Sequence, residues 1–219
     1  MKKSVPVFFI ICVFFLNASA QVNLKGVKPN GATVSARQKE LVVSWPVGNS
    51  AIGKMVLDLE NGRPLFSSLQ MGKPGDLKEV AAHLDPAFVL RIGKRTLSPN
   101  SGGWDVFFDR VPTRPYTTNV VKFAKGATSV FTKGAQTVVR INGVQCETFS
   151  GALEITCYNG SPLFNVAAVV STPKDSTAIL YDAGLISKKD NWSSVAWSDV
   201  KEIFSGKRQL KQIQVKIWK

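Results

Sequence analysis

The stretch TVVRINGVQCETFSGALEITCYNGSPLFNVAAVVS, which spans Thr137–Ser171, decides the fold that we expect for this chain. It contains four short apolar runs, rich in β-branched and aromatic residues, with a turn signal between each pair. The runs are Thr137–Ile141, Gln145–Phe149, Ala152–Tyr158 and Leu163–Ser171. This pattern predicts an antiparallel meander. Because the last run is almost continuously apolar, we expect both of its faces to be covered, which requires a second layer.

Strand signals continue on both sides of the meander. A hairpin is predicted with strands Ile52–Leu59 and Leu65–Met71, where Asn61-Gly62 supplies two positive-φ positions and Leu57 lies opposite Phe66. A second hairpin is predicted around Lys125-Gly126. The other predicted strands are Val22–Val27, Leu41–Pro46, Phe88–Ile92, Asp105–Val111, Asn119–Ala124, Ala127–Thr132 and Ala178–Tyr181, the last ending in a turn at Asp182-Ala183-Gly184.

Helical spacing occurs in one stretch, Pro74–Asp85, where Leu77, Val80, Ala81 and Leu84 recur three and four residues apart. The fold class predicted from these signals is all-β, a mainly antiparallel β-sandwich of the supersandwich kind, with at most one or two short helices.

Residues 1–20 have the organisation of a secretory signal peptide. Two lysines precede the apolar run Val5–Leu16, and Ala18-Ser19-Ala20 supplies small residues for cleavage. The apolar run is too short to remain as a membrane-spanning helix. We therefore expect export to the periplasm or the extracellular space, no stable membrane insertion after cleavage, and one β-sandwich domain over residues 21–200.

The formal net charge of +13 is high, but up to residue 200 the charges are interspersed. Nucleic-acid binding needs basic residues gathered on one face, so we expect no nucleic-acid partner. Basic residues do concentrate in residues 201–219, which contain six Lys/Arg and one Glu. Two interpretations of this C-terminal segment stay open. It is either a terminal strand, KQIQVKIWK, with alternating Ile213, Val215 and Ile217, or a truncated, poorly ordered end.

Two cysteines, Cys146 and Cys157, remain after removal of the signal peptide. If Gly151-Ala152 forms a type II′ turn, these two residues lie opposite each other, and a disulfide can form at a non-hydrogen-bonded pair. An exported protein permits such a bond. The alternative is a pair of buried thiols, because free cysteine is among the most buried residue types.

The chain lacks the motifs of common catalytic and metal sites. His83 is its only histidine, which excludes any site that needs two. Glycoside hydrolysis needs two carboxylates close to one bond, but Asp105 and Asp109 would lie about 13 Å apart on a strand. Glu147 and Glu154 are predicted to be diagonal neighbours on a solvated face. We therefore predict no catalytic, cofactor-binding or metal-binding residue.

Aromatic residues in turn-rich segments are the best candidates for ligand contact. Exposed rings on the loops of a sandwich can stack against sugars while a nearby carboxylate or amide orients the hydroxyl groups. By contrast, Trp45 and Trp197 are predicted to be buried in the core or against a sheet edge. The candidate ligand-binding residues are Trp104, Asp105, Tyr116 and Trp192.

Two stretches, GKMVLDLENGRPLFSSLQMG (Gly53–Gly72) and ETFSGALEITCYNGSPLFNVAAVVSTPKDSTAILYDAGL (Glu147–Leu185), resemble the N-terminal β-sandwich of large exported bacterial proteins related to glycoside hydrolases. More broadly, they are similar to the galactose-mutarotase-like supersandwich. The resemblance implies a carbohydrate-associated accessory domain, whose partner is a carbohydrate or an adjoining catalytic domain.

Sugar mutarotases use two histidines and a glutamate, whereas this chain has only His83. The resemblance therefore carries over no catalytic residue, and we do not expect this chain alone to be an enzyme. The alternative function is a periplasmic or surface protein-interaction module with no small ligand.

Overall fold

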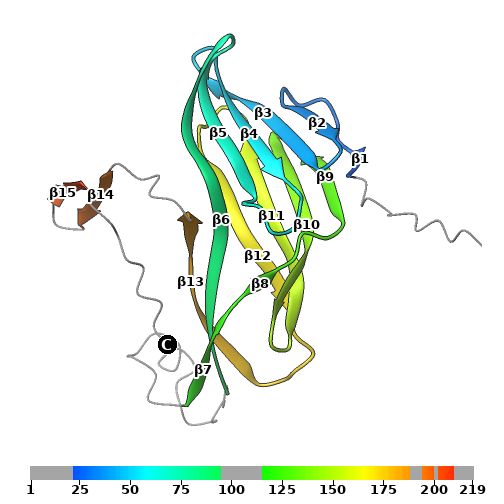
Figure 1. Cartoon of the computed structure of the whole chain (residues 1–219), viewed down its shortest axis with the longest axis vertical. Coiled ribbons are helices and arrows are strands. Elements are labelled where there is room, and N and C mark those ends of the chain that lie inside the picture. Colours follow the sequence, from blue (N-terminus) through cyan, green and yellow to red (C-terminus); the bar gives the residue numbers. More distant parts are fainter. Residues whose placement is uncertain (1–21, 95–114, 188–193, 200–201, 210–219) are drawn as a thin grey trace, which may run out of the picture.

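The computed structural model describes residues 22–94, 115–187, 194–199 and 202–209, and this described part is built of β-strands without a helix (Figure 1). The strands are β1 Asn23–Gly26, β2 Thr33–Arg37, β3 Glu40–Gly48, β4 Ala51–Asp58, β5 Phe66–Lys73, β6 Asp76–Lys94, β7 Tyr116–Val120, β8 Lys122–Phe123, β9 Thr128–Lys133, β10 Gln136–Cys146, β11 Phe149–Tyr158, β12 Phe164–Ser171, β13 Thr177–Ser187, β14 Ser194–Asp199 and β15 Glu202–Gln209.

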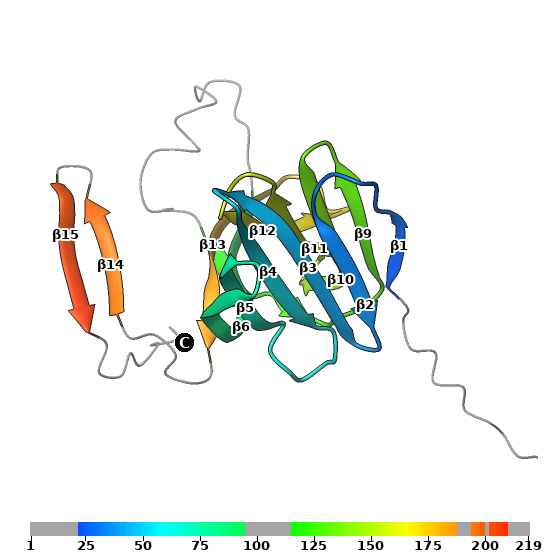
Figure 2. The ribbon, with the colours of Figure 1, turned by 90° about the horizontal axis from the view of Figure 1, so that it is seen from above.

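Strands β1 to β13 form two sheets that pack face to face (Figure 2). One sheet has the order β1-β9-β10-β11-β12, with β8 also paired to β10. The other has the order β13-β6-β5-β4-β3-β2, with β7 also paired to β6. The pairing of β1 with β9 is parallel and the other pairings are antiparallel. The predicted β-sandwich is therefore confirmed, and β14 and β15 form a further two-stranded sheet.

The core lies between the sheets because apolar residues alternate along the central strands and so share one face. Leu41 and Val43 on β3 and Ile155 on β11 are fully buried. Aromatic rings join the two layers, since Phe164 of β12 lies 6.0 Å from the ring of Phe66 and 6.4 Å from that of Trp45. Trp45 is 3% exposed, which confirms its predicted core position, and its indole N–H donates a 2.9 Å hydrogen bond to the carbonyl oxygen of Ser161.

The β4–β5 hairpin has the predicted core pair, with Leu57 opposite Phe66. The predicted turn conformation is wrong, because Gly62 has positive φ but Asn61 does not. Asn61 instead accepts a 2.8 Å hydrogen bond from the Lys125 backbone N–H through its side-chain oxygen. This contact ties the β4–β5 loop to the connection that leads into β9.

Two predicted strands of the meander are divided differently in the structure: Thr137–Ile141 and the start of Gln145–Phe149 belong to one strand, β10, which continues through a bulge at Gly143 and ends at Cys146, and Phe149 begins β11. The turn that follows is Glu147-Thr148 and not Ser150-Gly151. Gly143 and Gly151 are instead needed where another part of the backbone passes close to them. A Cβ atom would lie 1.8 Å from the Ala124 oxygen if placed on Gly143, and 2.0 Å from the Val169 oxygen if placed on Gly151. Both positions thus require glycine for close backbone approach.

The shifted turn also determines how far apart Cys146 and Cys157 lie. Cys146 lies opposite Phe149, whereas Cys157 lies opposite Thr137, at the other end of β11. The two sulfur-bearing residues are therefore about 26 Å apart along the strand, far beyond the separation that a disulfide spans. Both thiols are free and buried, and the disulfide between Cys146 and Cys157 is not formed.

The helix predicted over Pro74–Asp85 is wrong, because this segment belongs to the β5–β6 hairpin. Leu77 pairs with Gly72, and Leu84 pairs with Phe66. Pairing along the whole of β5 outweighs the three- and four-residue spacing of a few apolar residues. His83 is exposed and has a φ of 55°, at an irregular point of the long strand.

The hairpin predicted around Lys125-Gly126 is also wrong. β7 pairs with β6 in one sheet, whereas β8 and β9 pair with β10 in the other, so this part of the chain crosses between the layers. The Lys125 ammonium group holds the crossing in place. It donates to the carbonyl oxygens of Asp58, Glu60 and Arg63 at 2.6, 2.9 and 2.7 Å.

Two further predictions fail at the edges of the sheets. β12 is an edge strand with Val169 41% exposed, so its two faces are not both covered. β13 continues through Asp182-Ala183-Gly184, where a turn was predicted. The predicted strands at 105–111 and 211–219 lie outside the described residues.

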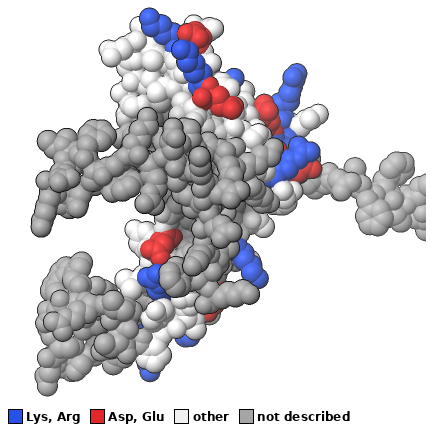
Figure 3. All heavy atoms as spheres, turned by 60° about the vertical axis from the view of Figure 1, so that its left-hand side comes forward, with Lys and Arg blue, Asp and Glu red and all other residues white. Residues whose placement is uncertain are grey.

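Charged residues of both signs lie close together on the face drawn in Figure 3. Two of the ion pairs lie on exposed strands or loops, namely Arg91 with Asp182 and Arg63 with Glu60, each at 3.2 Å. Among the described residues, this face therefore shows no broad area of a single sign.

Candidate ligand-binding site

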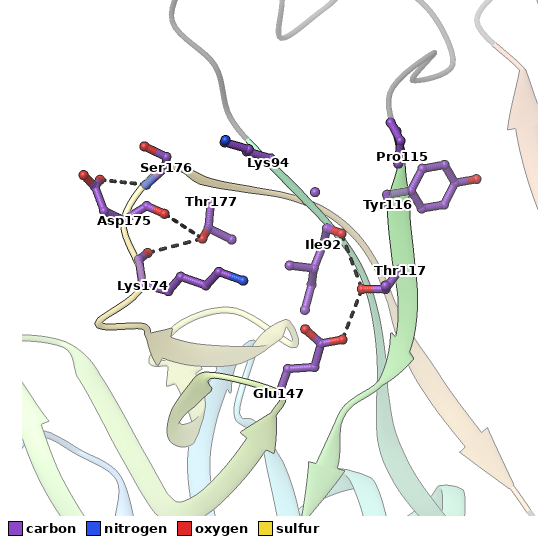
Figure 4. A pocket seen from close by; sticks show the side chains of 11 residues that line it. Ile92, Lys94, Pro115, Tyr116, Thr117, Glu147, Lys174, Asp175, Ser176 and Thr177 are labelled. Atoms are coloured by element: carbon purple, nitrogen blue, oxygen red, sulfur yellow. Dashed lines mark hydrogen bonds between the residues drawn. The ribbon is translucent and has the colours of Figure 1, made fainter.

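A cavity of about 500 Å³ lies at one end of the sandwich, where both sheets contribute residues. Four segments meet there: the last residues of β6, the first residues of β7, the β10–β11 turn and the β12–β13 connection (Figure 4). The volume falls within the range of small-ligand pockets. The lining residues are Ile92, Gly93, Lys94, Pro115, Tyr116, Thr117, Glu147, Lys174, Asp175, Ser176 and Thr177.

The cavity has a firm apolar base. Ile92 is 8% exposed and packs in a small cluster with Leu90, Cys146 and Phe149, which come from both sheets. Burial, and secondarily the negative charge of Glu147, raises the pKa of the Cys146 thiol. Contacts among these side chains from both sheets hold the base of the cavity in place.

Glu147 is the first residue of a two-residue turn and has a φ of 51°, a conformation usually left to glycine or asparagine. Its Oε1 accepts hydrogen bonds from Thr117 Oγ1 at 3.1 Å and from Asn119 Nδ2 at 2.7 Å, both on β7. These bonds join the turn of one sheet to a strand of the other. An unusual backbone conformation combined with an oriented carboxylate is a reason to suspect a functional role.

Lys174 lies across the cavity from this turn. Its side chain extends over the cavity toward Ile92 (Figure 4), and no described carboxylate lies within ion-pair distance of its ammonium group. Local bonds shape the connection around it. The Lys174 N–H donates to Thr172 Oγ1 at 3.2 Å, and Ser176, with φ 52°, donates its N–H to Asp175 Oδ1 at 2.7 Å.

The four candidates from the sequence meet different outcomes. Tyr116 is at the rim and 45% exposed, but its ring points away from the cavity on the other side of β7 (Figure 4). Trp104, Asp105 and Trp192 lie outside the described residues. The side chain of Trp197, on β14, is likewise outside them, so its predicted burial stays a prediction.

Glu147, Thr117 and Lys174 were missed as site residues. Glu147 was considered only as a partner of Glu154, in a register that is wrong. Glu154 instead forms an ion pair with Arg140 on the neighbouring strand. The run of turn residues after β12 was the one available signal for a structured loop at Lys174.

The carboxylates near the cavity do not converge. Asp175 also lines it, but its carboxylate turns outward and accepts from its own turn (Figure 4). Asp182 pairs with Arg91 at 3.2 Å. Within the described ranges, no three His, Cys, Asp or Glu side chains are grouped so that they could hold a metal ion. The polar groups that line the cavity, among them the Glu147 carboxylate and the Lys174 ammonium group, are able to form hydrogen bonds with a bound molecule.

Comparison with protein-family models, with curated proteins and with solved structures gives no match. In the described part of the chain, no helix has the length and apolar character needed to cross a bilayer. The class established by the fold is that of a mostly antiparallel β-sandwich, with a cavity at one end that is lined by both apolar and polar residues.

Proposed function

We propose that this chain is an exported, carbohydrate-associated β-sandwich that binds a glycan in the cavity and serves as an accessory domain to a carbohydrate-active catalytic domain. The observation that carries the proposal is that Glu147, Thr117 and Lys174 line one cavity together with the apolar residue Ile92. The resemblance of Gly53–Gly72 to exported proteins related to glycoside hydrolases supports the choice of ligand class.

The chemistry of the cavity favours a neutral molecule with many hydroxyl groups. A carboxylate accepts hydrogen bonds from sugar hydroxyls, and an ammonium group donates to them. An anionic ligand would meet the charge of Glu147, and a cationic ligand would meet Lys174. An uncharged glycan satisfies both groups, and its C–H face can rest on Ile92.

The proposal assigns no catalysis to the described residues. Glycoside hydrolysis places two carboxylates on either side of one glycosidic bond. In this cavity Glu147 is held by β7, and Asp175 is turned toward its own turn. Binding without bond cleavage is what such an arrangement supports.

Electrophoresis of the protein through gels containing single polysaccharides, alongside a glycan array, tests the proposal. We expect retardation by at least one polysaccharide, weakened about tenfold or more by Lys174→Ala or Glu147→Gln. Lys78→Ala on β6 and Glu40→Gln on β3 remove the same charges from exposed positions outside the cavity and should bind normally. Unfolding midpoints would show that all variants are folded.

Absence of retardation with every polysaccharide, or equal binding by the cavity variants and the controls, would overturn glycan binding at this site. Binding that instead depends on Trp104 or Trp192 would place the ligand at the loop aromatics predicted from the sequence. A catalytic domain encoded directly downstream in the same reading frame would support the accessory role.

A protein-interaction module is the second candidate, and one observation favours it. Apolar side chains are exposed along the edge strand β13, with Leu180 47%, Tyr181 69% and Ile186 47% exposed. Exposed apolar groups gathered on one element are typical of surfaces that contact another polypeptide. Failure of glycan binding together with capture of a protein partner through β13 would favour this function.

A further inference from the structure

β13 is an open edge of the larger sheet. It pairs with β6 along its whole length, and on its other side, from Thr177 to Ile186, no strand of residues 22–94, 115–187, 194–199 or 202–209 lies beside it. Figure 1 shows it at the margin of the sandwich, beside β6. A long edge strand presents a row of backbone N–H and C=O groups that another strand can pair with.

The inner face of this edge is apolar and incompletely covered. Ile179 lies opposite Ile92 and Tyr181 opposite Leu90, and both β6 residues are buried. Residues directly opposite across two strands share a face, so the odd-numbered residues of β13 face the sandwich interior. Nevertheless Ile179 is 39% and Tyr181 69% exposed, which leaves room for a further strand to extend the core.

Residues 210–219, LKQIQVKIWK, have the pattern such a strand needs, with Ile213, Val215 and Ile217 alternating with polar residues. The connection is also long enough for residues 210–219 to reach β13. Ser194 pairs with Gln209, so residue 210 leaves the β14–β15 hairpin next to the point where the chain enters it. The six residues 188–193 extend to about 20 Å, and a strand returning from there runs antiparallel to β13.

We propose that residues 210–219 pair with β13 as an antiparallel strand, in the register that places Lys216 opposite Asp182. In this register Tyr181 faces Ile217, and Leu185 faces Ile213, on the inner side. Asp182 already has Arg91 at 3.2 Å, and Lys216 adds a second cation beside a carboxylate that is 65% exposed. A shift by one residue would turn the apolar side chains outward.

A second copy of the chain fits the same edge less well. Two β13 strands paired antiparallel with full overlap would place Asp182 opposite its own counterpart, and like charges directly opposite each other destabilise a sheet. The segment of residues 201–219 carries six Lys/Arg against one Glu, so its charge complements Asp182. This inference does not depend on glycan binding, because it uses none of the polar groups that line the cavity.

Cysteine cross-linking in the full chain tests the register. Tyr181→Cys combined with Ile217→Cys should form an intramolecular link with a short thiol cross-linker at least tenfold faster than Tyr181→Cys combined with Trp218→Cys, which places the second thiol on the other face. Peptide mass mapping distinguishes these links from Cys146 and Cys157. Equal rates for the two pairs, or links formed only between molecules, would overturn the proposal.

Amide hydrogen exchange provides a measurement that needs no cross-link. Ile213→Lys with Ile217→Lys should speed exchange in β13 at least tenfold. Gln212→Lys with Gln214→Lys adds the same charge on the other face and should leave β13 protected. If β13 exchanges at the same rate in the unchanged chain and in both variants, residues 210–219 do not cover it.

Discussion

At the scale of single residues, Lys125 shows how one side chain connects the two layers. Its ammonium group satisfies three carbonyl oxygens of the β4–β5 loop from a position between β8 and β9. Desolvation lowers the pKa of Lys125, although the nearby charges of Asp58, Asp85 and Glu60 oppose the shift. Charge-assisted hydrogen bonds are stronger than neutral ones, so we expect this contact to stabilise the fold although the Lys125 side chain is partly exposed.

We predict that Lys125→Met lowers the free energy of unfolding by about 1.5–3 kcal/mol, because the three carbonyl oxygens lose a charged donor. The neighbouring exposed Lys122→Met serves as the control in urea denaturation. Since the pKa of Lys125 is lower in the folded state, the unfolded state binds more protons just below pH 10.5, and stability from this group rises with pH there. Equal effects of the two substitutions would contradict the assignment.

The cysteines allow a second residue-scale prediction. Burial raises the pKa of the Cys157 thiol to about 12, and that of Cys146 is raised as well. Native protein should resist iodoacetamide at neutral pH, whereas denaturation without reductant should expose two modifiable thiols. Because the folded state keeps a proton that the unfolded state loses, Cys157 should lower stability as pH rises from about 9 to about 12. Unmodified cysteines after denaturation would reveal a disulfide.

At the scale of elements, the glycines explain where sequence reasoning succeeded and failed. Glycine next to a polar residue predicts a turn, and this holds at Gly62. At Gly143 and Gly151 the same signal marks places where another backbone passes too close for a side chain. Local sequence does not distinguish these cases, because the approaching strand comes from elsewhere in the chain.

We predict that Gly151→Ala destabilises the protein by about 1–3 kcal/mol, because the added Cβ would overlap the Val169 oxygen and push β12 from β11. Gly184→Ala, on β13, has no heavy atom within 4 Å of the added Cβ and should be close to neutral. Thermal unfolding of both variants measures the difference. Equal unfolding midpoints for the two variants would show that β12 can shift without loss of stability.

The helix prediction for Pro74–Asp85 is wrong for a different reason. Its apolar residues satisfy helical spacing, but the preceding strand, β5, pairs with it at most positions between Phe66 and Lys73. Strand formation depends on such neighbours more than on intrinsic preference. Because the pairing partners of a strand are set by the fold, the spacing of apolar residues within these twelve residues was not enough to predict their secondary structure.

At the scale of the whole molecule, the core is shared by both sheets. Phe66 is fully buried and its ring lies 6.0 Å from that of Phe164 in the opposite layer. We predict that Phe66→Ala costs about 3–5 kcal/mol, since it leaves a cavity between the sheets. Val80→Ala, at a side chain 68% exposed, is the control. Guanidinium unfolding should remain one transition, and a selective loss of one sheet would contradict a shared core.

The cavity is also a property of the whole molecule. Its polar residues come from positions 94 to 177, and their meeting depends on the crossing from β7 to β8 and on the turn at Glu147. Of the candidates named from the sequence, Tyr116 lies at its rim, and its ring points away (Figure 4). Neither the crossing nor the turn was predicted, so the cavity could not be.

The sequence by itself determined the all-β class, the approximate places of most described strands and the Leu57–Phe66 pair, because alternation and glycine-bearing turns act over a few residues. Only the tertiary structure decided the register of β10 with β11, the separation of Cys146 from Cys157 and the presence of Glu147 and Lys174 in the lining of one cavity. Each of these depends on contact between segments distant in the chain, and a one-residue change of register reverses which side chains meet.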